Sequence, residues 1–448
     1  MTWFAGYERT AVLSLAWGLT PTMLILPGCR DDDRNNGSGS STSTGSTGSS
    51  GTTDITVDGT ETVGTTEGPV TTSTSSSSGE SGSTTDPDPS TDSTGNFGCG
   101  DGVPEAGELC FLPSVMVSDV PTGALALGDL DGDLNLDLVT GQLDSIAVHL
   151  GNGDGTFAPA SPIMTPSGVL GVTIADFDGD MLLDLAVANT GDDSVGIHFG
   201  NGDGTFADPD LVPVGESPRG LAAADFNGGG NDLAVVNEAS ETVSVLINQG
   251  DGSFMPVPPL TVGTNPTSVL AVDLDGNDPL DLAVLNFGGG SISVFLGGPG
   301  GFLPETAFTT GVGPRALVPG DFDDDGSTDL ATPNQINDNV AFLRGSGTGT
   351  LLDPVFFSTG GGPREAAAGD FDGDDLPDLA IALEAENAIG ILRSTRRDSV
   401  SFASGEQQAT LERPIALVVG DLDGDNVDDI VVGSIEIGGG TAVVLANP

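Results

Sequence analysis

Short apolar runs separated by turn-forming residues extend over the whole of residues 111–448. One kind of run is rich in alanine and glycine, as in ALALGD (124–129), a second reads DLAVAN (184–189) and a third reads SVGIHFG (194–200). Apolar runs of this length, bounded by Gly, Asn and Asp, predict β-strands. After a turn such as NGDGTF, a fourth strand is predicted to begin at a phenylalanine: Phe157, Phe206, Phe254 and Phe302. The pattern predicts an all-β fold made of four-stranded units.

An aspartate-rich decapeptide marks each unit, between its first and second runs. It reads DLDGDLNLDL from Asp129, and similar copies begin at Asp176, Asp273, Asp321, Asp370 and Asp421. A copy that is one residue shorter, DFNGGGNDL, begins at Asp225. We number these Asp loops 1 to 7 in chain order and their residues as positions 1 to 10. Successive copies begin 47 to 51 residues apart, and four short strands at this period are typical of a β-propeller blade, so we expect seven blades.

The two ends of the array predict that the ring closes. The last unit stops after its third run, TAVVLANP, and so lacks a fourth strand. Residues 111–118, which precede loop 1, have the character of a lone fourth strand. If this segment completes the last blade, the ring has no open edge to pair with other chains.

With these motifs, residues 111–448 resemble the FG-GAP and VCBS repeat family, which includes the propeller of integrin α-subunits. The resemblance rests on the recurring D-x-[DN]-G-[DN]-x-x-x-D pattern and its flanking strands. It implies a propeller with cell-surface binding or adhesion as its function.

The Asp loops predict calcium sites. Positions 1, 3, 5 and 9 carry carboxylate or amide oxygens, and several hard oxygens around a small cavity favour Ca²⁺. Without a cation, carboxylates so close together would repel and raise one another's pKa. We therefore expect several Ca²⁺ ions, up to six or seven, with these ligands in the intact copies: Asp129, Asp131, Asp133 and Asp137; Asp176, Asp178, Asp180 and Asp184; Asp273, Asp275, Asn277 and Asp281; Asp321, Asp323, Asp325 and Asp329; Asp370, Asp372, Asp374 and Asp378; Asp421, Asp423, Asp425 and Asp429.

Two departures from the pattern qualify this prediction. Loop 3 has Gly229 where a ligand belongs, so Asp225, Asn227 and Asp232 make a weak site. Position 6 is expected to need a positive φ, which suits Gly326, while Leu134 and Met181 adopt that conformation poorly.

Charge excludes two classes of partner. The 448-residue chain has 66 acidic residues against 11 basic ones, a formal net charge of −55. Nucleic acids and anionic lipid headgroups both require a basic surface, so neither is an expected partner. Three arginines, Arg219, Arg315 and Arg364, recur six residues before their Asp loops. They predict either an anion or partner contact near the central channel, or an ion pair with a neighbouring blade of the same protein.

The N-terminal part predicts an exported lipoprotein. Residues 1–28 read as a signal peptide whose Leu-Pro-Gly-Cys end resembles a bacterial lipobox, so Cys29 is the expected lipidation site at the outer membrane or cell surface. Residues 29–98 are rich in Ser, Thr and Gly and predict a disordered stalk. Within 99–110, Cys99 and Cys110 are expected to form a disulfide. An ordinary cleaved signal peptide remains the alternative for residues 1–28.

The expected function is therefore binding of an extracellular protein or glycan by a monomeric, lipid-anchored propeller. No Ser/His/Asp or Cys/His set, zinc spacing or phosphate loop is present, and His149 and His198 occupy matching strand positions rather than a catalytic pair. An extracellular glycan hydrolase or lyase is an alternative, for which Glu238, Glu241, Glu384 and Glu386 are the available carboxylates. An envelope scaffold without a ligand is another.

Overall fold

The computed structural model describes residues 109–166, 168–374, 376–395, 399–403, 406–436 and 439–446. Within these ranges the chain forms 29 β-strands and no helix. Accordingly, no helix in this part of the chain is long and apolar enough to cross a membrane. The predicted signal peptide, stalk, Cys29 and Cys99 lie outside the described residues.

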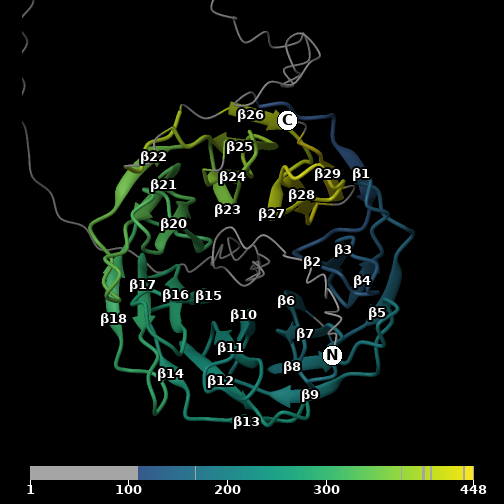
Figure 1. Ribbon diagram of the computed structural model, residues 1–448, viewed down its shortest axis with the longest axis vertical. Coiled ribbons are helices and arrows are strands. Elements are labelled where there is room, and N and C mark those ends of the chain that lie inside the picture. The colour runs from purple at the N-terminus through teal and green to yellow at the C-terminus, as the bar shows by residue number, and fades with distance from the viewer. Residues whose placement is uncertain are drawn as a thin grey trace, which may run out of the picture. The chain divides into compact units, whose positions relative to one another are not determined.

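The strands form seven antiparallel sheets arranged as the blades of a ring (Figure 1). In each of blades 1 to 6 the strands follow chain order from the centre outwards. Blade 1 is β2 (Ala124–Gly128), β3 (Asp137–Gly141), β4 (Ser145–His149) and β5 (Ser161–Met164); blade 2 is β6 (Val169–Ala175), β7 (Asp184–Asn189), β8 (Ser194–His198) and β9 (Asp210–Pro213); blade 3 is β10 (Pro218–Ala224), β11 (Asp232–Asn237), β12 (Thr242–Asn248), β13 (Phe254–Pro256) and β14 (Leu260–Thr261).

The remaining blades continue the same order. Blade 4 is β15 (Pro266–Val272), β16 (Asp281–Asn286), β17 (Ser291–Phe295) and β18 (Thr306–Thr309); blade 5 is β19 (Val318–Gly320), β20 (Asp329–Asn334), β21 (Asn339–Leu343) and β22 (Val355–Ser358); blade 6 is β23 (Pro363–Gly369), β24 (Asp378–Leu383), β25 (Ala388–Leu392) and β26 (Glu406–Ala409). The predicted all-β, seven-bladed propeller is therefore confirmed.

Blade 7 joins the two ends of the array. It consists of β27 (Pro414–Gly420), β28 (Asp429–Ser434) and β29 (Gly440–Val444), with β1 (Val115–Ser118) as its outermost strand. β1 pairs antiparallel with β29, with Val115 opposite Val443, and Phe111 forms a further bridge to Ala446. The outer strand expected within residues 111–118 thus closes the ring, so the first and last parts of the propeller share one sheet (Figure 1).

The hydrophobic core lies between the blades. Each of seven apolar clusters joins the facing sheets of two neighbouring blades; one, for example, packs Val172 and Leu185 of blade 2 against Ala126 and Val139 of blade 1. The second strands are buried on both faces, as DLAVAN at β7 is throughout its length, which explains why they read as unbroken apolar runs. Stability therefore depends on each blade having a neighbour on both sides.

The prediction that the fourth strand begins at the phenylalanine is wrong for blades 1, 2 and 4. Phe157 and Phe206 instead form isolated bridges to Gly151 and Gly200, which close the preceding turn. Their fourth strands begin four residues later, after an intervening proline that lacks the N–H needed to extend a ladder. Only in blade 3 does the strand begin at Phe254.

Candidate metal-binding loops

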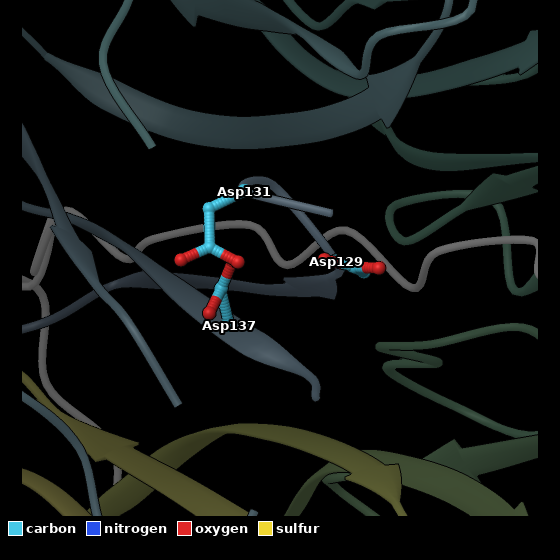
Figure 2. A group of neighbouring side chains, drawn as sticks. All are labelled: Asp129, Asp131 and Asp137. Carbon is cyan, nitrogen blue, oxygen red and sulfur yellow. The ribbon is translucent and has the colours of Figure 1, made fainter. Parts of the chain in front are cut away.

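Each Asp loop connects the innermost strand of a blade to the second strand. In loop 1, one oxygen from each of Asp129, Asp131 and Asp137 lies within 4.8 Å of the others. Figure 2 shows these three side chains, with the carboxylates of Asp131 and Asp137 directed toward one another. The same positions 1, 3 and 9 come together in loops 2 and 4: Asp176, Asp178 and Asp184; Asp273, Asp275 and Asp281. In loops 5 and 6 the groups are positions 1, 3 and 5: Asp321, Asp323 and Asp325; Asp370, Asp372 and Asp374.

Position 1 organises the turn of the loop. In loop 1, Asp129 Oδ1 accepts the backbone N–H groups of Gly132 at 2.7 Å and Asp133 at 3.1 Å, and its Oδ2 accepts that of Leu134 at 3.0 Å. The same arrangement recurs in loop 7, where Asp421 accepts from Gly424 and Asn426. The loop backbone therefore wraps around the first carboxylate, and the remaining side chains are drawn to the same place.

Position 9 has a role that the sequence analysis missed. Asp137 is fully buried, and its Oδ2 accepts the N–H of Leu130 at 2.7 Å while its Oδ1 accepts that of Gly151 at 2.8 Å. Gly151 follows the third strand, so this carboxylate joins the loop to the end of the third strand of its own blade. All seven copies do the same with both oxygens: Asp137, Asp184, Asp232, Asp281, Asp329, Asp378 and Asp429.

The repulsion expected among the carboxylates of the loops is reflected in raised pKa values. Burial, followed by neighbouring carboxylates, raises the pKa at position 3: Asp131, Asp178, Asp323, Asp372 and Asp423. At position 9, burial raises the pKa to about 6 in Asp137, Asp184 and Asp281, to about 7 in Asp329 and Asp429, and to about 8 in Asp378. Backbone N–H donors offset part of this shift. A bound cation would favour the charged form of each group.

The loops fit a hard cation. In loops 5, 6 and 7 the Oδ1 atoms of Asp323, Asp372 and Asp423 are buried and have no hydrogen-bond partner. A buried carboxylate oxygen left without a partner costs about 1–3 kcal/mol, and coordination to a metal would remove that cost. Oxygen-only ligands at this density suit Ca²⁺.

The backbone at position 6 has the expected positive φ in loops 1, 2, 5 and 7, but not in loop 4, where Asp278 precedes a proline. Gly326 and Asn426 have φ values of 82° and 69°, but Leu134 and Met181 also adopt positive φ, at 74° and 71°. Both side chains project into solvent, where Leu134 is 91% exposed. Loops 1 and 2 therefore adopt a left-handed residue here even though the sequence offers an unsuitable one.

Loop 3 differs, as its shortened sequence predicts. The Asn227 side-chain amide donates to both oxygens of Asp232, at 3.4 and 3.1 Å. An amide N–H thus occupies a place beside the carboxylate that a cation would otherwise take. In loop 4, Asn277 directs its amide to the carbonyl of Asp275 at 3.2 Å, so its proposed ligand oxygen is held within the loop.

Two arginines that the sequence analysis missed lie against loops 5 and 6. Arg344 Nη1 lies 3.5 Å from Asp323 Oδ2, and Arg393 Nη1 lies 3.4 Å from Asp372 Oδ2. Both arginines follow the third strand of their blade, where blade 1 has Leu150. Aligning the repeat units would show that this position is apolar in blade 1 and basic in blades 5 and 6.

The three recurrent arginines are held in contacts within the protein. Arg219 Nη1 lies 2.8 Å from Glu238 Oε2, and Arg364 Nη1 lies 3.1 Å from Glu384 Oε2. Each of these pairs joins the first strand of a blade to the turn after the second strand of the same blade, rather than to a neighbouring blade. An anion or partner contact of Arg219, Arg315 and Arg364 stays a prediction.

Arg315 belongs to a network that crosses blades. Its Nε donates to Gln335 Oε1 at 2.8 Å, and its guanidinium lies 4.0 Å from the centre of the Phe287 ring of blade 4. Gln335 in turn donates to Glu384 of blade 6 at 2.9 Å. Arg413, which the sequence analysis did not single out, pairs with both Glu384 and Glu436.

The two histidines are buried strand residues. His149 and His198 end β4 and β8, and they are 2% and 0% exposed. Burial lowers the pKa of His198 to about 4. Cys110 is also buried; because Cys99 lies outside the described residues, their disulfide stays a prediction.

A ring of seven four-stranded blades, each with an aspartate loop after its first strand, defines a class of protein: the β-propeller with acidic loops in its repeats. The sequence model of the FG-GAP-like repeat matches residues 129–187, 176–232 and 229–284. The chain is thus a β-propeller whose residues 129–284 carry FG-GAP-like repeats.

The chain is also similar to solved structures, of which those with a TM-score of at least 0.50 support the fold alone. BBS1N in its complex with ARL6DN is 15% identical, with a TM-score of 0.55 over 75% of this chain and 97% of that one. A protein from Lactobacillus plantarum is 16% identical, with a TM-score of 0.50 over 66% of this chain and 86% of that one. Virginiamycin B lyase from Staphylococcus aureus is 13% identical, with a TM-score of 0.49 over 75% and 98%. No curated protein sequence matches the chain.

Proposed function

We propose that the protein is a calcium-stabilised binding module of the bacterial cell surface, with its propeller carried on a lipid-anchored stalk. The observation that carries the calcium part is the convergence of three carboxylates within 4.8 Å in repeated loops. The carboxylate at position 9 joins each loop to the end of the third strand, so an ion held in the loop stabilises the blade. The proposed ions are structural, and the proposed ligand is an extracellular protein or glycan.

The face opposite the Asp loops is the proposed ligand-binding face. It carries the turns between second and third strands, which include Glu238 and Glu384, and these glutamates are ion-paired to Arg219 and Arg364. Carboxylates committed to guanidinium groups fit a rigid polar surface for recognition better than they fit general acid catalysis. Glu386, another carboxylate available to an enzyme, is likewise held within the protein, because it accepts the N–H of Gly361 at 2.5 Å.

A glycan and extracellular-protein array, probed with the full chain in calcium and in chelator, tests this function. Saturable binding to a defined ligand that disappears with chelation is the expected result. A turnover assay on the same glycans runs in parallel. Hydrolysis or elimination of a glycan, with loss in a Glu384→Gln variant, would replace the binding function by the enzymatic alternative.

The anchor needs its own experiment. Metabolic labelling with a fatty acid is expected to mark the wild type and to leave Cys29→Ala unlabelled. Equal labelling of both proteins would show that Cys29 is not the lipidation site and would leave the propeller as a secreted module.

A further inference from the structure

In blades 1, 2 and 5 the turn between the third and fourth strands, called here the outer turn, packs on the preceding blade and closes the gap to it. Gly204 in the NGDGTF turn of blade 2 donates its N–H to the carbonyl of Leu130 in loop 1 at 3.2 Å. Gly349 of blade 5 donates in the same way to Leu274 in loop 4 at 2.8 Å. A Cβ on Gly204 would lie 2.6 Å from the Leu150 side chain. The turn therefore packs directly on the apolar residue that follows the third strand of the preceding blade.

The gap between blades 3 and 4 lacks this seal. The turn Gly297–Phe302 of blade 4 is one residue shorter than the corresponding turn Gly200–Phe206 of blade 2. Its Gly301 donates to Gly298 of the same turn at 3.0 Å, instead of to the neighbouring blade. No atom lies within 4 Å of the place that a Cβ on Gly301 would occupy. The turn thus stands away from blade 3.

The other wall of the gap is shortened as well. Loop 3 of blade 3 is the Asp loop that is one residue short. Its residues Phe226 to Gly228 and the turn of blade 4 lie on the same cavity, which has a volume of about 800 Å³. Two one-residue deletions, far apart in the chain, therefore open a space at one blade interface.

The walls of this cavity are apolar. They include Phe226, Val245, Ile247, Val257, Leu260 and Phe302. The rings of Phe226 and Phe302 meet edge to face, with centroids 5.3 Å apart. Ile247 holds the sequence position that Leu150 holds in blade 1, but no glycine turn covers it. Cavities of about 300–1,000 Å³ with such walls are typical of small-molecule sites.

The polar residues of the lining determine the charge of the ligand. Asn227 and Asp278 are exposed and line the cavity, and none of its described lining residues is basic. The chain as a whole carries a net charge of −55. A carboxylate or phosphate would meet Asp278 without a cationic partner, whereas an amine would be attracted to it.

We propose that the cavity between blades 3 and 4 binds a small molecule with an apolar, ring-bearing body and a positively charged amine. The body lies between Phe302 and Ile247, and the amine points to Asp278. This site is separate from the proposed ligand-binding face and does not require a cation in the Asp loops.

Two fluorophores with the same body test the proposal. Dansylcadaverine ends in a primary amine, and dansyl-6-aminohexanoic acid ends in a carboxylate. Titrated against the full chain in calcium buffer, the amine is expected to bind with one-to-one stoichiometry and at least tenfold more tightly than the acid. Absence of saturable binding by the amine, or equal affinities for the two probes, would overturn the proposal.

Variants locate the site. Ile247→Trp and Val257→Trp fill the cavity from two positions on its wall, and each is expected to weaken binding of the amine at least tenfold. Leu211→Trp, on exposed strand β9 of blade 2, is the matched control and retains the wild-type affinity. Asp278→Asn is expected to remove the preference for the amine over the acid. If the folded filling variants bind the amine as the wild type does, the probe occupies another place and the proposal fails.

Discussion

The guanidinium of Arg344 lies 3.5 Å from the carboxylate of Asp323, so loop 5 already contains a positive charge. A Ca²⁺ ion in the same loop would be repelled by that charge and would compete for the same carboxylate. Arg344→Leu restores the residue found at this position in blades 1 and 4. We expect it to raise the calcium affinity of loop 5 about tenfold, which corresponds to about 1.4 kcal/mol, in isothermal titration calorimetry.

The control for this prediction is Arg315→Leu, because Arg315 contacts Gln335 and Phe287 away from the Asp loops. Its calcium isotherm is expected to match that of the wild type. If Arg344→Leu also leaves the isotherm unchanged while the wild type binds calcium, then Arg344 does not affect the site.

Calcium removal tests the loops as a group. Each occupied loop should add about 1.4 kcal/mol to the free energy of unfolding at a calcium concentration ten times its dissociation constant. We expect chelator to lower the melting temperature measured by differential scanning calorimetry, and excess calcium to restore it. Magnesium should restore it less, since it requires stricter octahedral geometry. A melting temperature that is the same with calcium and with chelator would rule out structural calcium.

In loop 3, the contribution of the position 9 carboxylate to stability can be tested separately from metal binding. Asp232 accepts the N–H groups of Phe226 at 3.0 Å and Asn248 at 2.7 Å, in the loop where a calcium ligand is missing. Asp232→Ala leaves both buried donors without a partner, at about 1–3 kcal/mol each. We expect urea denaturation to show a loss of about 2–6 kcal/mol that is equal with and without calcium.

Asp251→Ala, in the exposed outer turn of the same blade, serves as the control for Asp232→Ala and should change the denaturation midpoint little. A loss of stability for Asp232→Ala that appears only in calcium would mean that Asp232 acts as a metal ligand rather than as a brace.

The sequence predicts the ring because its repeat is visible without structure. The spacing of the loops defines the blades, and the missing fourth strand of the last unit indicates how residues 111–118 are used. The brace at position 9 escapes such reasoning, because the partner of Asp137, Gly151, lies beyond two strands and is an ordinary backbone N–H. The role of Arg413 could not be predicted either, since Arg413 precedes a proline, whereas the three recurrent arginines each follow one.

Contacts between blades are the other feature that could not be predicted from the sequence. The shortened loop 3 and the shortened turn before Phe302 can both be read in the sequence, but only the packing of blade 3 against blade 4 shows that they face one space. Similarly, Gln335 and Glu384 are 49 residues apart and meet because blades 5 and 6 are neighbours.

Strain at position 6 can be relieved. Leu134 has a φ of 74° and is 91% exposed, so its side chain makes little contact that would offset an unfavourable backbone conformation. A left-handed residue with a Cβ costs about 1–2 kcal/mol, and glycine avoids this at an entropic cost of about 0.5–1 kcal/mol. We expect Leu134→Gly to raise the free energy of unfolding by about 0.5–1 kcal/mol. Leu143→Gly, at an exposed residue without a positive φ, should lower it; a loss in both variants would argue against strain at Leu134.

The pH dependence of stability is expected to reflect His198. Burial lowers its pKa to about 4 in the folded protein, against about 6.5 when unfolded. Between these values the unfolded chain binds more protons, so stability is complete above about pH 6.5 and falls as the pH drops toward 4. The loss at pH 5 amounts to about 2 kcal/mol. His198→Leu, which places the residue of β12 and β21 at this position, should abolish it.

The measurement is urea denaturation of both proteins at pH 8 and pH 5. Carboxylates that titrate in the same range affect both proteins equally, so the difference between their pH profiles isolates the histidine. We expect His198→Leu to gain about 2 kcal/mol relative to the wild type on going from pH 8 to pH 5. Parallel profiles would mean that His198 becomes protonated in the folded protein as readily as in the unfolded chain, which would contradict its burial at the end of β8.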